Sequence, residues 1–318
     1  MTGSGGRRWR VAGRVAVGVA GVAVAAAAGT AAMLAAQIVF TPRTIPVPHD
    51  PPPRGDVAYG RRSSRRPLTM VVLGDSFAAG YGAERSRETP AALLAAGVAR
   101  RLRRRVSAYT LAVLGAETPE LRHQVDRALH LRPDIAIIYI GGNDVTQLAA
   151  QSARVRQLGA DVRRLRAAGA EVVVGTCPDL SALPPFRPPL RQLAGFLSRR
   201  LAAAQTVHVV RAGGSTVSLA DHLNPVFAAQ PDRMFGRDRF HPSADGYART
   251  AAATLPAVLA VLMRRHGVPT SGELRELGEA AHDAATQPGT TVHPARPGAQ
   301  SRTPPRETAQ PRRGRQEI

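Results

Sequence analysis

The sequence predicts an α/β fold, a three-layer α/β/α sandwich in which helices cover both faces of a parallel sheet. Short apolar runs rich in Val and Ile alternate with longer helical stretches between residues 67 and 268, and this alternation is typical of β-α-β units. Ser76, Gly115, Asn143 and Cys177 each follow directly after such a run. Because ligands bind beyond the carboxyl ends of the strands in these folds, we expect one shared site at that edge.

About five strands form the predicted sheet, and each is short and apolar, as expected for strands buried on both faces. The expected strands are residues 69–73, 107–113, 134–140, 171–176 and 206–210. The expected helices cover residues 87–104, 118–130, 147–168 and 189–204, and a last helix follows Pro242 and runs to residue 265. Pro90 and Gly169 stand where Pro starts and Gly ends a helix.

An apolar segment near the N-terminus, residues 15–40, contains no charged side chain. About 20 apolar residues cross a bilayer as a helix, so this segment predicts a transmembrane signal anchor. Residues 1–14 contain four Arg and no acid, which predicts a cytoplasmic N-terminus and an extracytoplasmic domain on a single-pass cell-membrane protein. Secretion after cleavage of a signal peptide is the alternative.

Two segments flank the predicted domain of residues 67–268. Residues 41–66 contain six Pro and several Arg, which is typical of an extended, semi-rigid linker. Residues 269–318 are polar and rich in Pro, Arg, Gln and Thr. We expect this tail to be mostly disordered, with a short polar helix within residues 271–285.

The net charge of +20 comes entirely from Arg, since the chain contains no Lys. No aromatic interleaving or nucleic-acid motif accompanies it, so we interpret the charge as an Arg-rich surface and expect no nucleic-acid partner. The single cysteine, Cys177, excludes an intramolecular disulfide and is expected to be a small buried side chain. No metal-ligand cluster, phosphate loop or dinucleotide fingerprint is present, so no metal or cofactor is expected.

The strongest chemical signal joins two distant motifs. Ser76 lies in Gly74-Asp75-Ser76-Phe77, directly after an apolar run, and Asp238 and His241 are three residues apart near the end of the domain. A tight turn after a strand presents a serine hydroxyl at the sheet edge, while an Asp and a His supply an oriented base. This set predicts a serine hydrolase. The structural alternatives are a helix cap for Ser76, a cap or loop residue for Asp238 and a structural histidine at His241.

The four motifs together resemble the signature blocks of the SGNH/GDSL hydrolase family. Gly74-Asp75-Ser76 is similar to the first block and does not match the Gly-x-Ser-x-Gly elbow of other hydrolases. Gly115 lies in a segment that resembles the second block. Gly141-Gly142-Asn143-Asp144 is similar to the third block, and Asp238-x-x-His241 is similar to the last. The resemblance covers about 200 residues, from 67 to 268.

This resemblance implies an SGNH-type fold and a serine esterase that cleaves carboxylic esters of lipids, acylated glycans or small molecules through an acyl-enzyme. It implies Ser76 as nucleophile, His241 as base and Asp238 as the carboxylate that orients it. The implied oxyanion donors are the backbone N–H groups of Ser76 and Gly115 and the side-chain amide of Asn143. Acyl transfer to an envelope glycan and a non-catalytic carbohydrate- or lipid-binding module are the alternatives. The loop 178–190 and the segment 211–240 are expected to shape the acyl pocket, with Leu180, Leu183 and Phe186 as apolar candidates.

Overall fold

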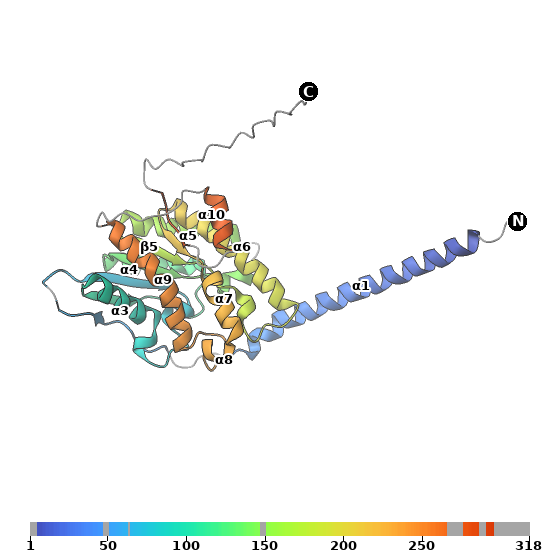
Figure 1. Cartoon of the computed structure of the whole chain (residues 1–318), viewed down its shortest axis with the longest axis horizontal. Helices are drawn as coiled ribbons and strands as arrows, with labels where there is room; N and C mark the ends of the chain where they lie inside the picture. Colours follow the sequence, from blue (N-terminus) through green and yellow to red (C-terminus); the bar gives the residue numbers. More distant parts are fainter. Residues whose placement is uncertain are drawn as a thin grey trace, which may run out of the picture.

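The computed structural model describes residues 5–46, 51–62, 64–146, 151–265, 276–285 and 291–295. Within this part of the chain, one sheet has the strand order β1-β3-β2-β4-β5-β6-β7, and helices cover both of its faces (Figure 1). The predicted three-layer α/β/α sandwich is therefore confirmed.

The five central strands are parallel, as predicted, and the two edge strands pair antiparallel to their neighbours. The strands are β1 (Ala58–Tyr59), β2 (Leu68–Gly74), β3 (Val106–Thr110), β4 (Ile135–Tyr139), β5 (Glu171–Gly175), β6 (Ser215–Val217) and β7 (Thr291–Val292). The helices are α1 (Gly5–Thr44), α2 (Ser76–Ala79), α3 (Pro90–Leu102), α4 (Leu121–His130), α5 (Gln151–Ala167), α6 (Leu190–Arg211), α7 (Leu219–Ala229), α8 (Pro231–Met234), α9 (Ala244–Arg265) and α10 (Leu277–Ala284).

The core lies on both faces of β2 and β4, because successive side chains of a strand point to opposite faces. Met70 and Val72 pack in one cluster with residues of α3 and α9. Val71 and Leu73 pack in the other cluster with residues of α4 and α5. All four side chains are fully buried, so neither face of the central strands is left to solvent.

One predicted strand is wrong. Residues 206–210 form the last part of α6, and the strand lies further on, at Ser215–Val217. The apolar run Val207–Val210 contains buried Val209, which packs with α5 residues in the core. Gly213 and Gly214 then separate the helix from β6. A buried helical face and a buried strand are equally apolar, so the run alone does not distinguish them.

The edges of the sheet come from segments that we expected to lie outside the domain. β1 belongs to the predicted linker of residues 41–66, and β7 belongs to the predicted disordered tail of residues 269–318. The short helix predicted within 271–285 forms as α10, which contacts α6. Two-residue strands are too short to carry a periodic sequence signal. Residues 269–275, 286–290 and 296–318 of the predicted tail, and residues 266–268 of the predicted domain, lie outside the described residues.

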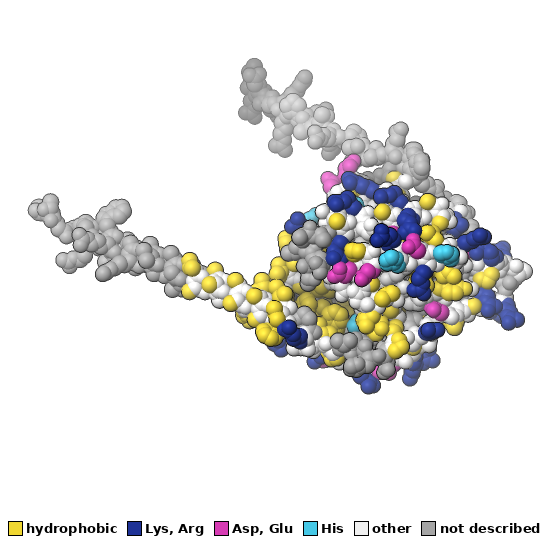
Figure 2. All heavy atoms as spheres, turned by 180° about the vertical axis from the view of Figure 1, so that it is seen from behind, with side chains coloured by type: hydrophobic (Ala, Val, Ile, Leu, Met, Phe, Trp, Pro, Cys, Tyr) yellow, Lys and Arg dark blue, Asp and Glu magenta, His cyan; other side chains and the backbone are white. Residues whose placement is uncertain are grey.

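Helix α1 projects away from the domain (Figure 1). Its Val24–Thr41 part is long and apolar enough to cross a membrane, and none of it is buried; Figure 2 shows it as an apolar rod. Helix α9 meets the same criteria of length and composition but is half buried in the domain. Near the domain, α1 contacts the segment before α6 through Gln37. The Gln37 side chain donates to Pro188 O at 2.9 Å and accepts from Leu190 N at 3.0 Å.

Candidate active site

The turn after β2 presents Ser76 at the carboxyl edge of the sheet. Gly74 has φ +135°, and a Cβ there would lie 1.7 Å from Tyr139 O, so only glycine fits. Asp75 caps α2 and accepts from Phe77 N at 2.9 Å. Gln124 of α4 holds the end of the strand: it accepts from Gly74 N at 2.7 Å and donates to Gly74 O at 2.8 Å. The nucleophile candidate therefore stands on a turn that is fixed from two sides.

Ser76, His241 and Asp238 form one hydrogen-bonded chain. His241 Nε2 lies 2.9 Å from Ser76 Oγ, and His241 Nδ1 lies 2.5 Å from Asp238 Oδ2. The other carboxylate oxygen of Asp238 accepts from Phe240 N and His241 N, each at 3.0 Å. An ionised carboxylate only accepts hydrogen bonds, so the proton of neutral His241 resides on Nδ1 and Nε2 faces the serine as a base.

The carboxylate of Asp238 stays ionised in this setting. Partial burial raises the pKa of Asp238, but the hydrogen bond from His241 and those from backbone N–H groups outweigh burial and hold that pKa below its usual value. Both Ser76 and His241 are buried, with 8% and 5% of their surface exposed. The negative charge of Asp238, which stabilises a protonated His241, is therefore present and largely shielded from solvent.

The loop of His241 is supported by Gly82, Tyr81 and Tyr247, and of these the sequence singled out only Tyr247, as part of the last motif. Gly82 has φ +90°, and a Cβ there would lie 2.4 Å from Pro242 O. Tyr247 of α9 donates its hydroxyl to Tyr81 O at 2.6 Å. The rings of Tyr81 and His241 have their centroids 5.6 Å apart. These contacts support the loop that carries His241.

Asn143 lines the same cavity as Ser76 and His241. Its Nδ2 donates to Ala116 O at 3.0 Å, and this carbonyl fixes the orientation of the amide because a carbonyl only accepts. An amide NH₂ has two donors, so one N–H remains for a ligand. Gly115 precedes Ala116, is exposed and has φ +73°. It is not among the described residues that line the cavity.

A buried ionic network joins the segments of Asn143 and Gly115, and sequence reasoning missed its central residue, Arg154. Arg154 of α5 contacts Asp144 Oδ1 at 2.5 Å and Glu117 Oε2 at 2.7 Å. Asp144 also accepts from Thr118 N at 3.1 Å and Thr118 Oγ1 at 2.7 Å. Asp144 follows Asn143, while Glu117 follows Ala116, so the network fixes the distance between both oxyanion-donor candidates.

Two further titratable groups lie against the site. Burial raises the pKa of Asp75 to about 7, and nearby Asp144 adds to the effect. Burial also raises the pKa of the Cys177 thiol well above its usual value. A thiol that stays protonated is a poor nucleophile. Cys177 is fully buried, in accordance with the packing role expected from the sequence.

The raised pKa of Asp75 predicts a pH-dependent loss of stability. The unfolded chain releases this proton near pH 4 and the folded chain near pH 7, so the free energy of unfolding falls as the pH rises through this window. Asp75→Asn keeps an acceptor for Phe77 N and removes the titration. Urea unfolding at pH 5, 6, 7 and 8 should show the variant gaining stability relative to wild type as the pH rises.

Asp126→Asn is the matched control, because the Asp126 side chain is about half exposed and its hydrogen bond to Arg164 lowers its pKa. This variant should differ from wild type by the same amount at every pH between 5 and 8. A constant difference between Asp75→Asn and wild type over that range would contradict a buried, titrating Asp75.

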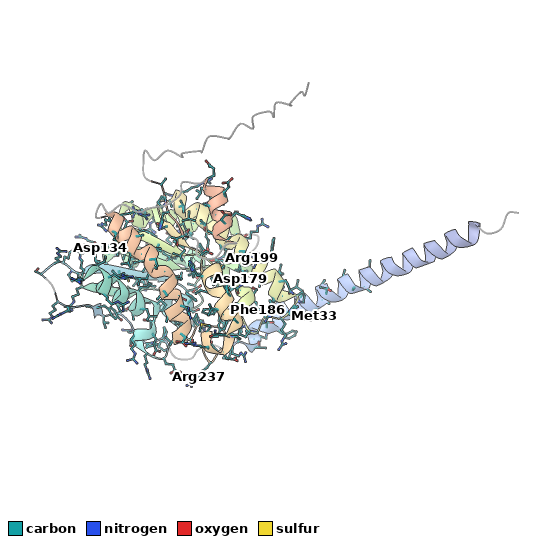
Figure 3. All side chains as sticks on the ribbon, viewed as in Figure 1. Met33, Asp134, Asp179, Phe186, Arg199 and Arg237 are labelled. Carbon is teal, nitrogen blue, oxygen red and sulfur yellow. The ribbon has the colours of Figure 1, made fainter. Side chains whose placement is uncertain are left out.

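An apolar cavity of about 100 Å³ extends from Ser76 into the domain. It is lined mainly by aromatic and aliphatic side chains, among them Phe77, Leu180, Leu183, Leu219, Leu223, Phe227 and Phe240. The loop 178–190 and the segment 211–240 thus both contribute walls, while Phe186 packs against the core outside this lining. Asp179 also lines the cavity, and Arg199 of α6 pairs with it at 2.6 Å (Figure 3).

No group of three or more His, Cys, Asp and Glu side chains among the described residues is placed to hold a metal ion. The candidate site consists of the Ser76, His241 and Asp238 chain, the amide of Asn143 and the apolar cavity beside them.

Comparison with known proteins adds three findings. The sequence model of the GDSL-like Lipase/Acylhydrolase family matches residues 72–249. The chain is 38% identical over 276 residues to the GDSL-like esterase Rv1075c of Mycobacterium tuberculosis, covering 83% of this chain and 87% of that protein. The crystal structure of the lipase Lip_vut3 from a goat rumen metagenome matches with a TM-score of 0.50 at 19% identity, covering 60% of this chain and 96% of that one. The last match is a likeness of fold.

Proposed function

This chain belongs to the GDSL-like lipase/acylhydrolase family and cleaves ester bonds, and from that premise we propose that Ser76, His241 and Asp238 carry out the reaction. The observation that carries the proposal is the continuous contact from Ser76 Oγ to His241 Nε2 at 2.9 Å and from His241 Nδ1 to Asp238 Oδ2 at 2.5 Å. A serine hydroxyl is a weak nucleophile until a base in hydrogen-bond contact removes its proton.

The reaction proceeds in two halves. Ser76 Oγ attacks the ester carbonyl while His241 Nε2 takes its proton, and Asp238 stabilises the imidazolium. The tetrahedral intermediate expels the alcohol, which leaves with the proton from His241, and an acyl-enzyme on Ser76 remains. Water then loses a proton to His241, attacks the acyl-enzyme and releases the carboxylic acid. Ser76 recovers its proton from His241, so the enzyme returns to its starting state.

The negative oxygen of the tetrahedral intermediate needs donors that are already in place. We assign this role to the free N–H of the Asn143 amide and to the backbone N–H groups of Ser76 and Gly115. The contact of Asn143 with Ala116 O at 3.0 Å supports the assignment, because it orients the amide nitrogen. The Arg154 network supports it further, since it holds the segments of Asn143 and Gly115 together.

The cavity favours esters of short acyl chains. A buried apolar cavity of about 150 Å³ holds a benzene molecule, so one of about 100 Å³ holds an acyl chain of about four carbons. With the full chain in detergent and p-nitrophenyl esters from acetate to laurate, kcat/KM should peak at or below six carbons and fall by about tenfold or more at laurate. A maximum at laurate would contradict this assignment of the cavity.

Two leucine variants separate the cavity from general packing. Leu223 lines the cavity, whereas Leu262 is buried in the same core without lining it. Leu223→Ala should shift the best ester to a longer acyl chain, because it lengthens the cavity. Leu262→Ala should lose stability to a similar extent, about 2–5 kcal/mol, without shifting the preferred acyl length.

We also assign α1 to the membrane as a single-pass signal anchor, with residues 1–14 in the cytoplasm and the catalytic domain outside. The unburied apolar part Val24–Thr41 supports this placement, as do the four Arg that precede it. Intact-mass analysis of the protein from its native membrane should find the N-terminal segment retained. A mature chain that begins within or after α1 would instead indicate a cleaved signal peptide.

A further inference from the structure

A second cavity, of about 280 Å³, lies beside the acyl cavity and is basic. Three arginines from two parts of the chain line it: Arg187 and Arg191 around the start of α6, and Arg239 from the loop that carries Asp238 and His241. Its described lining is Ser181, Ala182, Pro184, Arg187, Arg191, Ala228, Pro231 and Arg239. No acidic side chain is part of that lining, so the cavity offers guanidinium groups without carboxylates.

The charge in this cavity is poorly neutralised by the protein. Neither Arg187 nor Arg191 has a carboxylate within 4.0 Å among the described residues, as the ion pairs of the chain show. Arg191 Nε donates to Phe186 O at 2.8 Å, which orients the guanidinium and leaves the donors of its terminal nitrogens for a ligand. Arg239 pairs with Asp232 at 3.3 Å, but both side chains are largely exposed, and such pairs are weak.

The two cavities share a wall. Ala182 lines both of them, and the adjacent residues Arg239 and Phe240 each line one. Arg239 also lies between Asp238 and His241, with φ +54°, so the basic cavity begins at the triad loop itself. The basic cavity therefore adjoins the acyl cavity at the loop that carries Asp238 and His241.

We propose that this basic cavity binds a phosphate group carried on the alcohol portion of the ester substrate. The inference rests on the proposed function, because it places the acyl chain in the apolar cavity. Arg guanidinium groups bind phosphate oxygens through paired, charge-assisted hydrogen bonds, and a phosphate monoester carries close to two negative charges at neutral pH. Three arginines without a lining carboxylate match that charge better than a neutral alcohol does.

The position of α1 agrees with this ligand. Gln37 of α1 binds Pro188 O and Leu190 N, and these residues lie between Arg187 and Arg191. With α1 as a membrane anchor, the basic cavity is near the bilayer surface, where the phosphate groups of lipids lie. Figure 3 shows Phe186, the neighbour of Arg187, near the end of α1 that meets the domain. Arg237, which does not line the basic cavity, lies at another edge of the domain in the same view.

The test compares 1-butyrylglycerol with 1-butyrylglycerol 3-phosphate, which differ only in the phosphate. With the full chain in detergent, kcat/KM for release of butyrate should be about tenfold higher for the phosphorylated ester, as expected when charge-assisted hydrogen bonds are gained. Arg187→Gln and Arg191→Gln should each bring the ratio of the two kcat/KM values toward one. This ratio cancels any effect of a substitution that is common to both esters.

Arg237→Gln is the control. Arg237 directly precedes Asp238 in the sequence, but it lines a different groove, and its side chain is 94% exposed. It should keep the wild-type ratio. A ratio near one in wild type, a ratio retained in both cavity variants, or an equal loss in Arg237→Gln would each overturn the proposal. Failure to hydrolyse either ester would instead contradict the proposed acyl specificity or function.

Inorganic phosphate distinguishes a substrate group from a free ion. If the cavity holds the phosphate of the substrate, inorganic phosphate should compete with the phosphorylated ester, raising its KM, and this competition should weaken in Arg191→Gln. A cavity that serves a free anion would instead let phosphate alter turnover of 1-butyrylglycerol while the two esters have equal kcat/KM. That second result would overturn the assignment to the substrate.

Discussion

Replacing Ser76 by alanine should lower kcat for a short-chain ester by about 10³-fold or more, because the variant lacks the hydroxyl that forms the acyl-enzyme. His241→Ala should cost as much, since Ser76 without its base keeps its proton. The two residues act as one unit through the 2.9 Å contact of Ser76 Oγ with His241 Nε2, so the double variant should be no slower than either single variant. Initial rates of p-nitrophenyl butyrate hydrolysis measure all three.

Ser107→Ala is a matched control for the loss of a serine hydroxyl. Ser107 is half-buried in β3, on the strand beside β2, and takes no part in the proposed reaction. Its variant should keep kcat within about threefold of wild type. If Ser76→Ala and His241→Ala each lost little activity, or if their losses multiplied in the double variant, the two residues would not act as nucleophile and base in one step.

Replacing Asn143 by alanine should lower kcat by about 10²–10³-fold with little change in KM, the usual result of removing one oxyanion donor. The amide N–H binds the oxygen most strongly when that oxygen becomes negative, so its loss affects the transition state more than the bound substrate. Steady-state kinetics with p-nitrophenyl butyrate separates the two constants.

Asn224→Ala is the control for this prediction, because Asn224 is an asparagine that lines the same cavity and has no part in the proposed reaction; its amide nitrogen donates to Asp179 at 3.3 Å. This variant should change kcat by less than tenfold. The affinity for an alkyl boronic acid, which forms a tetrahedral adduct with a serine, should fall with kcat in Asn143→Ala. A fall in affinity for substrate alone would show that Asn143 only helps to bind the ester.

The sequence predicted the central sheet well because its strands carry a strong local signal. β2 and β4 are continuous apolar runs that are buried on both faces, and such runs stand out in any window. The predicted strand at residues 206–210 was wrong because apolar residues also occur on the buried face of a helix. Val209 packs in the core from α6. The edge strands β1 and β7 contain two residues each, so only tertiary pairing defines them.

Within the site, the predictable residues were those that stand in compact motifs. Ser76, Asn143, Asp238 and His241 each carry a recognisable local pattern, and the parallel strands β2 and β4 bring Ser76 and Asn143 to one edge of the sheet. Arg154 had no such pattern. It lies on a helix, and its partner Glu117 is distant in the sequence. Because the chain has 43 basic residues, the sequence does not distinguish Arg154 from the other arginines.

The contacts that support the loop of His241 could not be predicted from the sequence either. Gly82 and Tyr81 contact residues more than 150 positions away in the sequence, Pro242 and Tyr247, and neither Gly82 nor Tyr81 stands in a motif that indicates a role. The same limit applies to Arg187, Arg191 and Arg239, whose common cavity exists only in the folded chain.

The most direct test of the account is to identify the residue that an alkyl fluorophosphonate labels on the folded chain. This reagent reacts with an activated serine and leaves a stable adduct in the place of the tetrahedral intermediate. Peptide mass spectrometry should find one adduct, on the peptide that contains Ser76, with loss of activity in proportion and with labelling greatly slowed in His241→Ala. A folded wild-type chain that stays unlabelled, or one that loses activity through labelling of another residue, would contradict Ser76 as the nucleophile.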